Sequence, residues 1–343
     1  METQIATTDS EINTNETVRQ AVALLQAGDL VALPTETVYG LAADALDPAA
    51  VEKIFAAKER PHFDPLIVHV HHKDALYEVA EVPEEIRKTV VKLTETFWPG
   101  PLTLVLPRRA TIPDLVTSGL DTVAVRQTDH PVFHRILRNF GGPVAAPSAN
   151  MFGQLSPTSA QAVVDQLDGR IPLIVDGGAC GRGLESTIVK ISPGEKKPII
   201  EVLRPGPITE IDLKKFGKVV FAKRNKVVED SAPEAPGMLQ SHYAPHKPLR
   251  LLERPEDFSP EEGKRYALLS YRGQQKDGYL DLHEWDEIAI LSPGSGRVAE
   301  AGIRLFHVIR QLDFSDVDEI ISEPFPDRGV GKAILDKLRK ASS

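Results

Sequence analysis

The sequence lacks several features that mark particular classes of protein. Cys180 is the single cysteine among 343 residues, which excludes an intramolecular disulfide framework and any CxxC metal or redox site. No apolar run approaches the ~18 residues that a membrane-spanning helix needs. The first residues are acidic and polar, unlike a signal or transit peptide. We therefore expect a cytoplasmic protein with no membrane association.

Basic residues are also in deficit. The chain has 40 Lys and Arg against 49 Asp and Glu, a net charge of −9. Proteins that bind nucleic acid without sequence preference are normally basic, so we expect no stable nucleic-acid binding. Any contact with a nucleotide must come from a local cluster of cations. Hydrophobic residues make up 41% of the chain, which is typical of globular proteins and excludes a disordered chain.

Common catalytic motifs are missing as well. There is no P-loop, no H-E-x-x-H zinc motif and no G-x-S-x-G nucleophile elbow. His69, His71 and His72 lie close together in the sequence, but no second group of ligands lies near them. Histidines of a strand and a surface explain this cluster better than a zinc site.

Helical and strand-like patterns alternate along the chain, but several strands follow one another directly, which predicts a mixed sheet. Helices are predicted at residues 17–26, from 47–48 onward, and at 74–80, 84–97, 131–140, 159–167, 298–312 and 332–339. Strands are predicted at residues 30–33, 66–70, 102–106, 122–126, 144–146, 173–176, 187–191, 199–203, 249–252, 266–270, 288–291 and 319–322.

The pattern lapses between about residues 221 and 248, where four prolines and a run of charges occur, and we assign residues 223–248 to this segment. This stretch is too long for an ordinary connection within a compact domain, so it is either a linker or a functional loop. It separates a first unit, residues 1–222, from a smaller α/β unit, residues 249–343.

Polar residues follow several of the predicted elements. Lys58 and Arg60 offer a point charge and a planar donor for phosphate, although a solvated helix end explains them better when they are taken alone. Ser148 and Asn150 suit either hydrogen bonds to a ligand or an ordinary turn. Arg126 ends a buried strand, so it needs a carboxylate or a ligand anion as partner.

Two further groups lie at predicted strand ends. Glu185 and Ser186 precede a strand, and Arg204 ends another. Ligand sites of α/β sheets usually lie at strand ends. Together, these residues indicate one polar, cationic cavity for a phosphorylated ligand.

Taken in order, these segments resemble the YrdC-type threonylcarbamoyl-AMP synthase family in its longer two-domain form. The match runs from about residue 23 to residue 207, continues around residues 235–245, and is weaker beyond residue 249. It is carried by Pro34-Thr-Glu-Thr-Val-Tyr-Gly-Leu41, Lys58-x-Arg60-Pro61, Pro65-Leu-Ile-Val-His69, Trp98-Pro-Gly-Pro-Leu-Thr103, Val123-Ala-Val-Arg126, Ala146-Pro-Ser-Ala-Asn150, Ser156-Pro-Thr158, Glu185-Ser-Thr-Ile188, Leu203-Arg-Pro-Gly206 and His242-Tyr-Ala-Pro245.

The resemblance implies a fold and a reaction. The fold is a YrdC-like twisted mixed open sheet with helices (residues 1–222), a long Pro-rich linker or lid (223–248) and a Rossmann-like α/β domain (249–343). In the reaction, L-threonine, bicarbonate and ATP give L-threonylcarbamoyl-AMP and pyrophosphate. Mg²⁺ is expected on the ATP phosphates, and no protein metal ligand is assigned. The product would pass to the machinery that transfers the threonylcarbamoyl group to tRNA.

The resemblance also assigns residues by position. The expected ATP contacts are Lys58, Arg60, Asp64, Thr122, Ser148, Asn150, Ser156, Arg204 and Tyr243, the last as part of a lid over the site. The expected L-threonine contacts are Thr35, Thr37, His69, Arg126 and Ser186. Asp64 departs from the family, where Asn is common. Its carboxylate would repel phosphate unless it faces Mg²⁺, Lys58 or Arg60, or simply points outward.

Two other functions are compatible with parts of the sequence. An RNA-binding module of the same fold would need no chemistry, but the acidic charge and the lack of interleaved aromatics count against it. A related carbamoyl-adenylate domain of hydrogenase maturation would carry zinc fingers, which one cysteine cannot supply. For the C-terminal unit, our hypothesis is that it anchors the lid.

Overall fold

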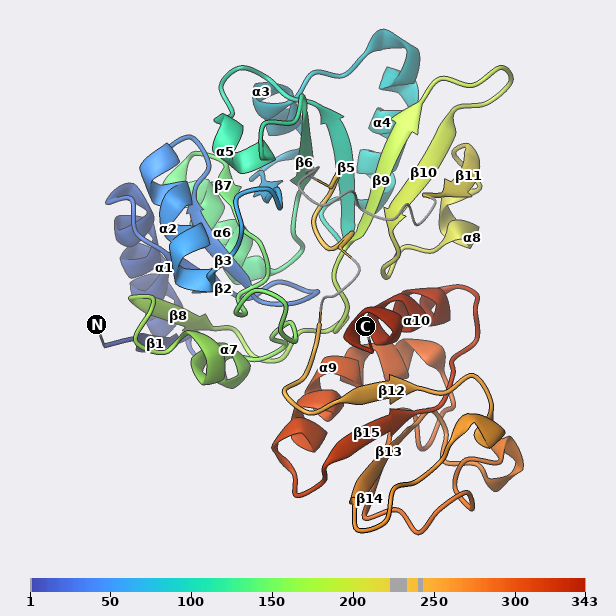
Figure 1. Ribbon diagram of the computed structural model, residues 1–343. Coiled ribbons are helices and arrows are strands. Elements are labelled where there is room, and N and C mark those ends of the chain that lie inside the picture. Colours follow the sequence, from blue (N-terminus) through green and yellow to red (C-terminus); the bar gives the residue numbers. More distant parts are fainter. Residues whose placement is uncertain (1, 223–232, 240–242, 343) are drawn as a thin grey trace.

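The computed structural model describes residues 2–222, 233–239 and 243–342, which form two units around separate sheets (Figure 1). The strands of the first sheet are β1 (Gln4–Thr7), β2 (Val31–Leu33), β3 (Gly40–Asp44), β4 (Ile67–His69), β5 (Leu102–Pro107), β6 (Thr122–Arg126), β7 (Val144–Ala145), β8 (Leu173–Asp176), β9 (Thr187–Ser192), β10 (Ile199–Arg204) and β11 (Lys218–Phe221). The strands of the second sheet are β12 (Leu249–Leu251), β13 (Tyr266–Ser270), β14 (Glu287–Ile290) and β15 (Glu319–Ser322).

The first sheet has the strand order β1-β8-β2-β3-β7-β4-β6-β5-β9-β10-β11, and its neighbours pair in both parallel and antiparallel directions. The second has the order β12-β15-β13-β14, and all of its pairs are parallel. The prediction of a mixed α/β fold with a second, smaller sheet is confirmed.

The helices of the described chain are α1 (Glu11–Gln26), α2 (Pro48–Lys58), α3 (Leu76–Val79), α4 (Glu84–Phe97), α5 (Asp114–Thr117), α6 (Pro131–Phe140), α7 (Ala160–Leu167), α8 (Glu210–Leu213), α9 (Val298–Phe314) and α10 (Val330–Ala341). Short 3-10 turns occur at Lys73–Ala75, Pro255–Asp257 and Gln275–Asp277. None of the helices in the described ranges is both long enough and apolar enough to cross a bilayer.

Side chains of the first sheet alternate between two hydrophobic layers, one on each face of the sheet. Along β2, Val31 and Leu33 pack with α1 and α6, whereas Ala32 faces the opposite layer, which α2 and α4 cover. This is the period of two that a pleated strand imposes. Near β4, β6 and β9, the face opposite α4 carries only a small apolar cluster that includes Ala235. That face is therefore open for a site.

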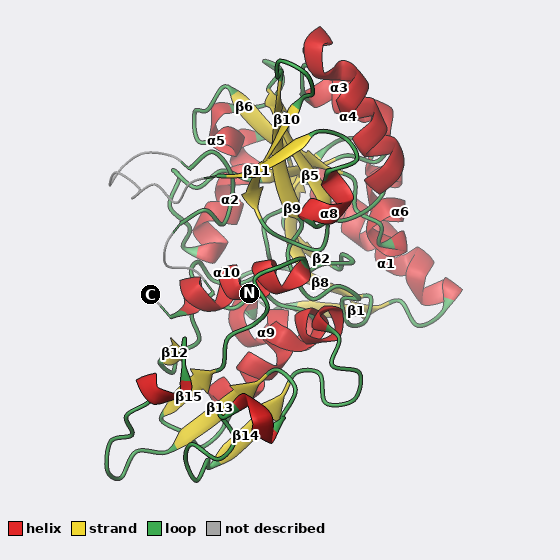
Figure 2. Ribbon diagram, turned by 90° about the vertical axis from the view of Figure 1, so that its right-hand side faces the viewer, coloured by secondary structure: helices red, strands yellow, loops and turns green. Residues whose placement is uncertain are grey.

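The second unit places its helices against the first. Both views show α9 and α10 between the two sheets (Figures 1 and 2). Their apolar residues share one buried cluster with Val38, Leu155 and Leu184 of the first unit. Gly183 has φ +68°, and a Cβ there would lie 2.3 Å from the carbonyl oxygen of Ile303 on α9, so this close approach requires glycine.

The element predictions were wrong mainly at ends and in short segments. Helix α1 begins at Glu11 and not at residue 17, because the Ser10 side chain accepts a hydrogen bond from the Asn13 amide and caps the helix. Strands β1, β3 and β11 were missed, as were the short helices α5 and α8. The predicted linker lies partly outside the described residues, at 223–232 and 240–242.

Candidate functional site

A cavity opens on the face of the first sheet that the helices leave free. Val68 and Val125 pack into the helix-covered layer, so alternation turns Ile67, His69 and Arg126 to the opposite face. The parallel pairing of β4 with β6 sets His69 directly beside Arg126. The cavity is narrow and partly open to solvent.

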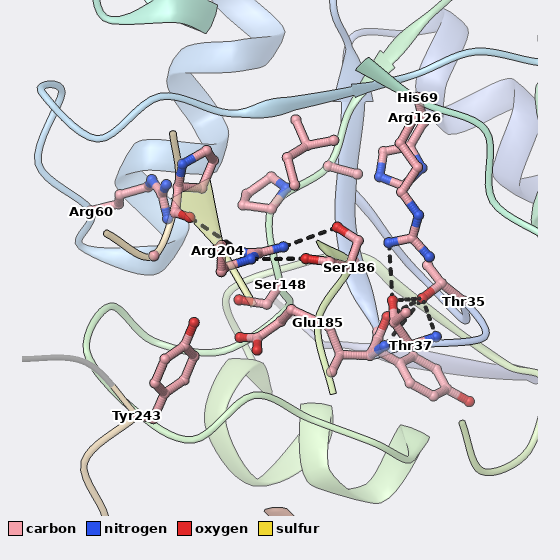
Figure 3. A pocket seen from close by; sticks show the side chains of 18 residues that line it. Thr35, Thr37, Arg60, His69, Arg126, Ser148, Glu185, Ser186, Arg204 and Tyr243 are labelled. Atoms are coloured by element: carbon pink, nitrogen blue, oxygen red, sulfur yellow. Dashed lines mark hydrogen bonds between the residues drawn. The ribbon is translucent and has the colours of Figure 1, made fainter. Parts of the chain in front are cut away.

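The pocket has two ends (Figure 3). His69, Arg126, Thr35 and Thr37 lie together at one end, which we call the Arg126 end. Arg60, Arg204, Ser148 and Tyr243 lie at the other, which we call the Arg204 end. Glu185 and Ser186 lie between them.

Arg126 is held by three partners at its own end. Its guanidinium donates to the Gly100 carbonyl at 3.2 Å, to the Thr37 hydroxyl at 3.0 Å and to Glu36 Oε1 at 2.5 Å. Burial alone would raise the pKa of Glu36, but Arg126 and the Thr128 hydroxyl outweigh it and lower that pKa. Arg126 is therefore an oriented cation at the pocket wall, and Glu36 is its charged anchor.

Thr35 shapes the loop after β2. Its hydroxyl donates to the Val38 carbonyl at 2.6 Å and accepts from the amides of Thr37 and Val38 and from the Thr37 hydroxyl. These bonds within the turn use the donor and the acceptor capacity of the hydroxyl. Thr35 consequently positions Thr37, which in turn accepts from Arg126.

His69 is neutral at pH 7. Burial, followed by the nearby Arg126 charge, lowers its pKa to about 3. Its ring stacks on Phe133 with centroids 5.1 Å apart, and Nδ1 has no hydrogen-bond partner among the described residues. His69 thus offers the Arg126 end a neutral ring atom for a hydrogen bond.

At the other end, Arg204 fixes the residues around Ser186. Its guanidinium donates to the Ser186 carbonyl at 3.1 Å, to the Ser186 hydroxyl at 3.0 Å and to the Pro236 carbonyl at 3.4 Å. Thr103 on β5 exchanges a further hydrogen bond of 2.7 Å with the Ser186 hydroxyl. Arg204 therefore ties the end of β10 to the turn before β9 and to the segment at Pro236.

Arg60 reaches the same end just beyond α2. It forms a buried ion pair of 2.9 Å with Asp64 and donates to the carbonyls of Asp64 and Pro65. Asp64 is fully buried, so it faces Arg60 and does not point outward. Burial raises the pKa of Asp64, against the opposing effect of the Arg60 charge.

Lys58 lies beneath the pocket and not in its lining. Its ammonium donates to the carbonyl of Ser148 at 2.6 Å and to that of Asn150. Burial, followed by repulsion from Arg60, lowers the pKa of Lys58 well below its usual value. Asn150 turns inward too and donates to the carbonyls of Met151 and Gln154. Both residues hold the loop that presents Ser148.

Most of the predicted contacts converge, but not all of them. The pocket is lined by Thr35, Thr37, Arg60, His69, Arg126, Ser148, Ser186, Arg204 and Tyr243. The lining does not include Lys58, Asp64, Thr122, Asn150 and Ser156. Thr122 begins β6 whereas Arg126 ends it, so three residues of the strand lie between Thr122 and Arg126. Ser156 does not line the pocket, but its hydroxyl donates at 2.8 Å to the carboxylate of Glu185, which does.

Sequence reasoning missed two charged residues around the pocket, Glu36 and Lys337, and it named Glu185 as part of the cavity without assigning it a substrate. Glu36 anchors Arg126, Glu185 lines the cavity, and Lys337 of α10 lies 3.4 Å from Glu185 Oε2. Glu36 and Glu185 stand inside motifs of the resemblance, next to residues that were predicted. No signal in the sequence links Lys337 to the pocket.

The pocket's chemistry is that of an anion-binding site. Three arginines reach it, and hydroxyls of Ser148, Ser186 and Thr37 accompany them. Within the described ranges, no group of three or more His, Cys, Asp or Glu residues could hold a metal ion. Such a site can bind and orient phosphate and carboxylate groups, which is what transfer of a nucleotidyl group needs most.

Two family models together match nearly the whole chain. The Sua5/YciO/YrdC model, described as "Telomere recombination", matches residues 23–209. The model described as "Threonylcarbamoyl-AMP synthase, C-terminal domain" matches residues 207–343.

Individual relatives agree with these matches. The threonylcarbamoyl-AMP synthase of Bacillus subtilis is 40% identical and aligns over 97% of this chain and 95% of its own. The threonylcarbamoyl-AMP synthase of Pyrococcus abyssi is 39% identical and aligns over 95% of this chain and 94% of its own. The crystal structure of P. abyssi Sua5 complexed with L-threonine superposes with a TM-score of 0.84, at 36% identity and over 99% and 98% of the two chains. The chain belongs to the Sua5/YrdC family of threonylcarbamoyl-AMP synthases.

Proposed function

We propose that this chain joins L-threonine, bicarbonate and the AMP part of ATP into L-threonylcarbamoyl-AMP, with release of pyrophosphate, for the threonylcarbamoyl modification of tRNA. The observation that carries the proposal is the pocket with two cationic ends on one sheet face. One end suits the carboxylate of a small amino acid, and the other suits a chain of phosphates. The relatives named above are synthases of this product, so the RNA-binding alternative is not favoured.

The reaction runs in two balanced steps. The threonine amine takes up bicarbonate and gives a carbamate and water. A carbamate oxygen then attacks the α-phosphorus of ATP, and pyrophosphate leaves. Neither step needs a covalent enzyme intermediate, so the protein's contribution is orientation and charge stabilisation.

The residues divide between the substrates. Arg126 binds the threonine carboxylate, and His69, Thr37 and Ser186 surround the rest of the amino acid. Thr35 contributes by holding the loop of Thr37. This assignment extends to our chain the threonine binding that is recorded for P. abyssi Sua5.

ATP occupies the Arg204 end in this proposal. Arg60, Ser148, Arg204 and Tyr243 touch it, while Lys58, Asp64, Asn150 and Ser156 support those residues through the contacts described above. Thr122 remains a candidate for the far edge of the nucleotide.

Mg²⁺ fits this site as a partner of the nucleotide. A hard cation that is held mainly by phosphate oxygens requires few protein carboxylates. The Arg204 end offers cations and hydroxyls, which suit phosphates, and the nearby acids Asp64 and Glu185 are ion-paired to Arg60 and Lys337. When bound, Mg²⁺ would neutralise charge on the leaving pyrophosphate.

The chain's organisation follows from the same proposal. We assign residues 1–222 to a catalytic domain, 223–248 to a Pro-rich linker and lid, and 249–343 to a Rossmann-like domain. Support comes from the turn at residues 233–239, whose Pro236 and Gly237 line the pocket together with Tyr243. We place the reaction in the cytoplasm, where ATP and tRNA occur, with the tRNA transfer machinery as recipient.

The test is pyrophosphate release from ATP and bicarbonate with Mg²⁺ and one amino acid at a time. Release should depend on L-threonine, and equal release with L-serine or with no amino acid would contradict the proposal. Arg126→Ala should raise the KM for threonine by about 30-fold or more and change that for ATP far less, because a charge-assisted pair is lost. Arg60→Ala should instead raise the KM for ATP and change the KM for threonine far less.

A further inference from the structure

A buried chain of charges connects the pocket to helix α10. Lys337 Nζ lies 3.4 Å from Glu185 Oε2 and 3.6 Å from Asp336 Oδ2, and Lys340 Nζ lies 2.7 Å from the same Asp336 oxygen. Lys340 also donates to the Gly237 carbonyl at 2.8 Å. None of the four charged residues is more than 9% exposed. We call Glu185, Lys337, Asp336 and Lys340 the charge chain.

The members of the charge chain compensate one another's charges. It contains two carboxylates and two ammonium groups, which alternate in space. Lysine is almost never fully buried without a partner, and an ion that loses its buried partner is costly. Lys337 is therefore a buried counter-ion of Glu185, and Lys340 is a buried counter-ion of Asp336.

Lys337 contacts a second residue of the pocket lining. Its ammonium lies 4.8 Å from the centroid of the Tyr243 ring, a cation–π contact. The same ring packs on Phe306 of α9 with centroids 5.6 Å apart. Tyr243 and Glu185 also interact with each other. One lysine of the second unit thus supports both pocket residues from outside the pocket.

We propose that Lys337 is a positioning residue for the nucleotide end of the pocket. It holds Glu185 and Tyr243 in place, and its positive charge reduces the repulsion between the Glu185 carboxylate and the triphosphate in a site of low dielectric constant. The inference rests on the proposed function and makes the second unit a participant in ATP binding.

The variant Lys337→Met keeps an unbranched side chain that is one atom shorter and removes the charge. By isothermal titration calorimetry we expect its ATP affinity to fall about tenfold or more, while its L-threonine affinity changes by less than about threefold. The matched control is Lys332→Met on the same helix. Lys332 contacts Asp327 at 3.2 Å and lies 4.6 Å from the ring centroid of Phe221 in the first unit, away from the pocket. This control should bind ATP as the unmodified protein does.

A second variant separates charge compensation from packing. If Lys337 acts by neutralising Glu185, the double variant Lys337→Met with Glu185→Gln should bind ATP within about threefold of Glu185→Gln alone. The double variant has no carboxylate at position 185, so it tests the proposal even where Lys337→Met does not fold.

Two outcomes would overturn the inference. One is an ATP affinity of Lys337→Met that equals that of Lys332→Met, and the other is a double variant as weak as Lys337→Met itself. Failure of the proposed function has a different signature, namely no threonine-dependent pyrophosphate release by the unmodified protein, whatever the ATP affinities of the variants.

Discussion

At the scale of single residues, the pocket is organised before a substrate arrives. Arg126 is 3% exposed, and its guanidinium is already held by Gly100, Thr37 and Glu36. A side chain that is ordered in advance loses less conformational entropy on binding. In the proposed assignment the threonine carboxylate would share this arginine with Glu36, so the strength of that ion pair would also set the affinity for threonine.

His69 gives the protein a measurable pH dependence. Its pKa is about 3 in the folded protein against an ordinary value of 6.5. Between these values only the unfolded chain binds the proton, so folding stability is lost as the pH falls through this window. A His69→Gln variant lacks this proton uptake. From pH 7 to pH 5, the unmodified protein should lose about 2 kcal/mol more unfolding free energy than the variant, measured by urea denaturation. Equal losses would show that His69 titrates normally.

At the scale of elements, strand alternation and one turn define the pocket. The ends of β4 and β6 place His69 and Arg126 side by side, and the end of β10 delivers Arg204. The turn at residues 233–239 then passes over the Arg204 end, where its Gly237 has φ +74°. A Cβ at Gly237 would lie 2.8 Å from the Tyr243 hydroxyl and 3.2 Å from Arg204 Cδ.

The variant Gly237→Ala should therefore move Tyr243 away from Arg204 and weaken ATP binding about fivefold or more, since the added methyl group has no room. Gly263→Ala is the matched control. It has φ +81°, so it carries the same left-handed strain, but its Cβ would meet nothing within 4 Å. Nucleotide titrations of both variants make the comparison, and identical affinities would remove the turn from the nucleotide site.

At the scale of the whole molecule, the two units share a core. Leu184, Leu155 and Val38 are buried with residues of α9 and α10, and Arg310 of α9 donates to the carbonyls of Leu155 and Ser156. The second unit thus packs directly behind the wall that contains Glu185.

Gly183→Ala tests this packing. The added Cβ would lie 2.3 Å from the Ile303 carbonyl oxygen, so the units must separate, and we expect a loss of about 2–4 kcal/mol that includes left-handed strain. Gly178→Ala in the same turn has φ +84° and open space, so it should cost only about 1–2 kcal/mol. Thermal unfolding of both proteins gives the difference. If the two variants unfold at the same temperature, the close contact between Gly183 and Ile303 does not contribute to the packing of the two units.

The sequence by itself determined the elements whose signals are local. The segments Glu84–Phe97, Thr122–Arg126 and Pro131–Phe140 have the predicted bounds, because periodicity, prolines and turn residues act within a few positions. Strand β3 was missed, because its small residues have little intrinsic preference for strands and its partners β2 and β7 decide its conformation. The motifs also nominated most of the polar side chains that line the pocket, since they mark backbone ends that meet at one sheet face.

Only the tertiary structure decided which nominated side chains face the cavity. Lys58 turns to the carbonyls of Ser148 and Asn150, and Asp64 turns to Arg60, because a buried charge takes the nearest partner that the fold supplies. The pairing of Glu185 with Lys337 joins two units whose sequences carry no sign of each other. Contacts of this kind depend on how helices dock on sheets, and local sequence does not encode that arrangement.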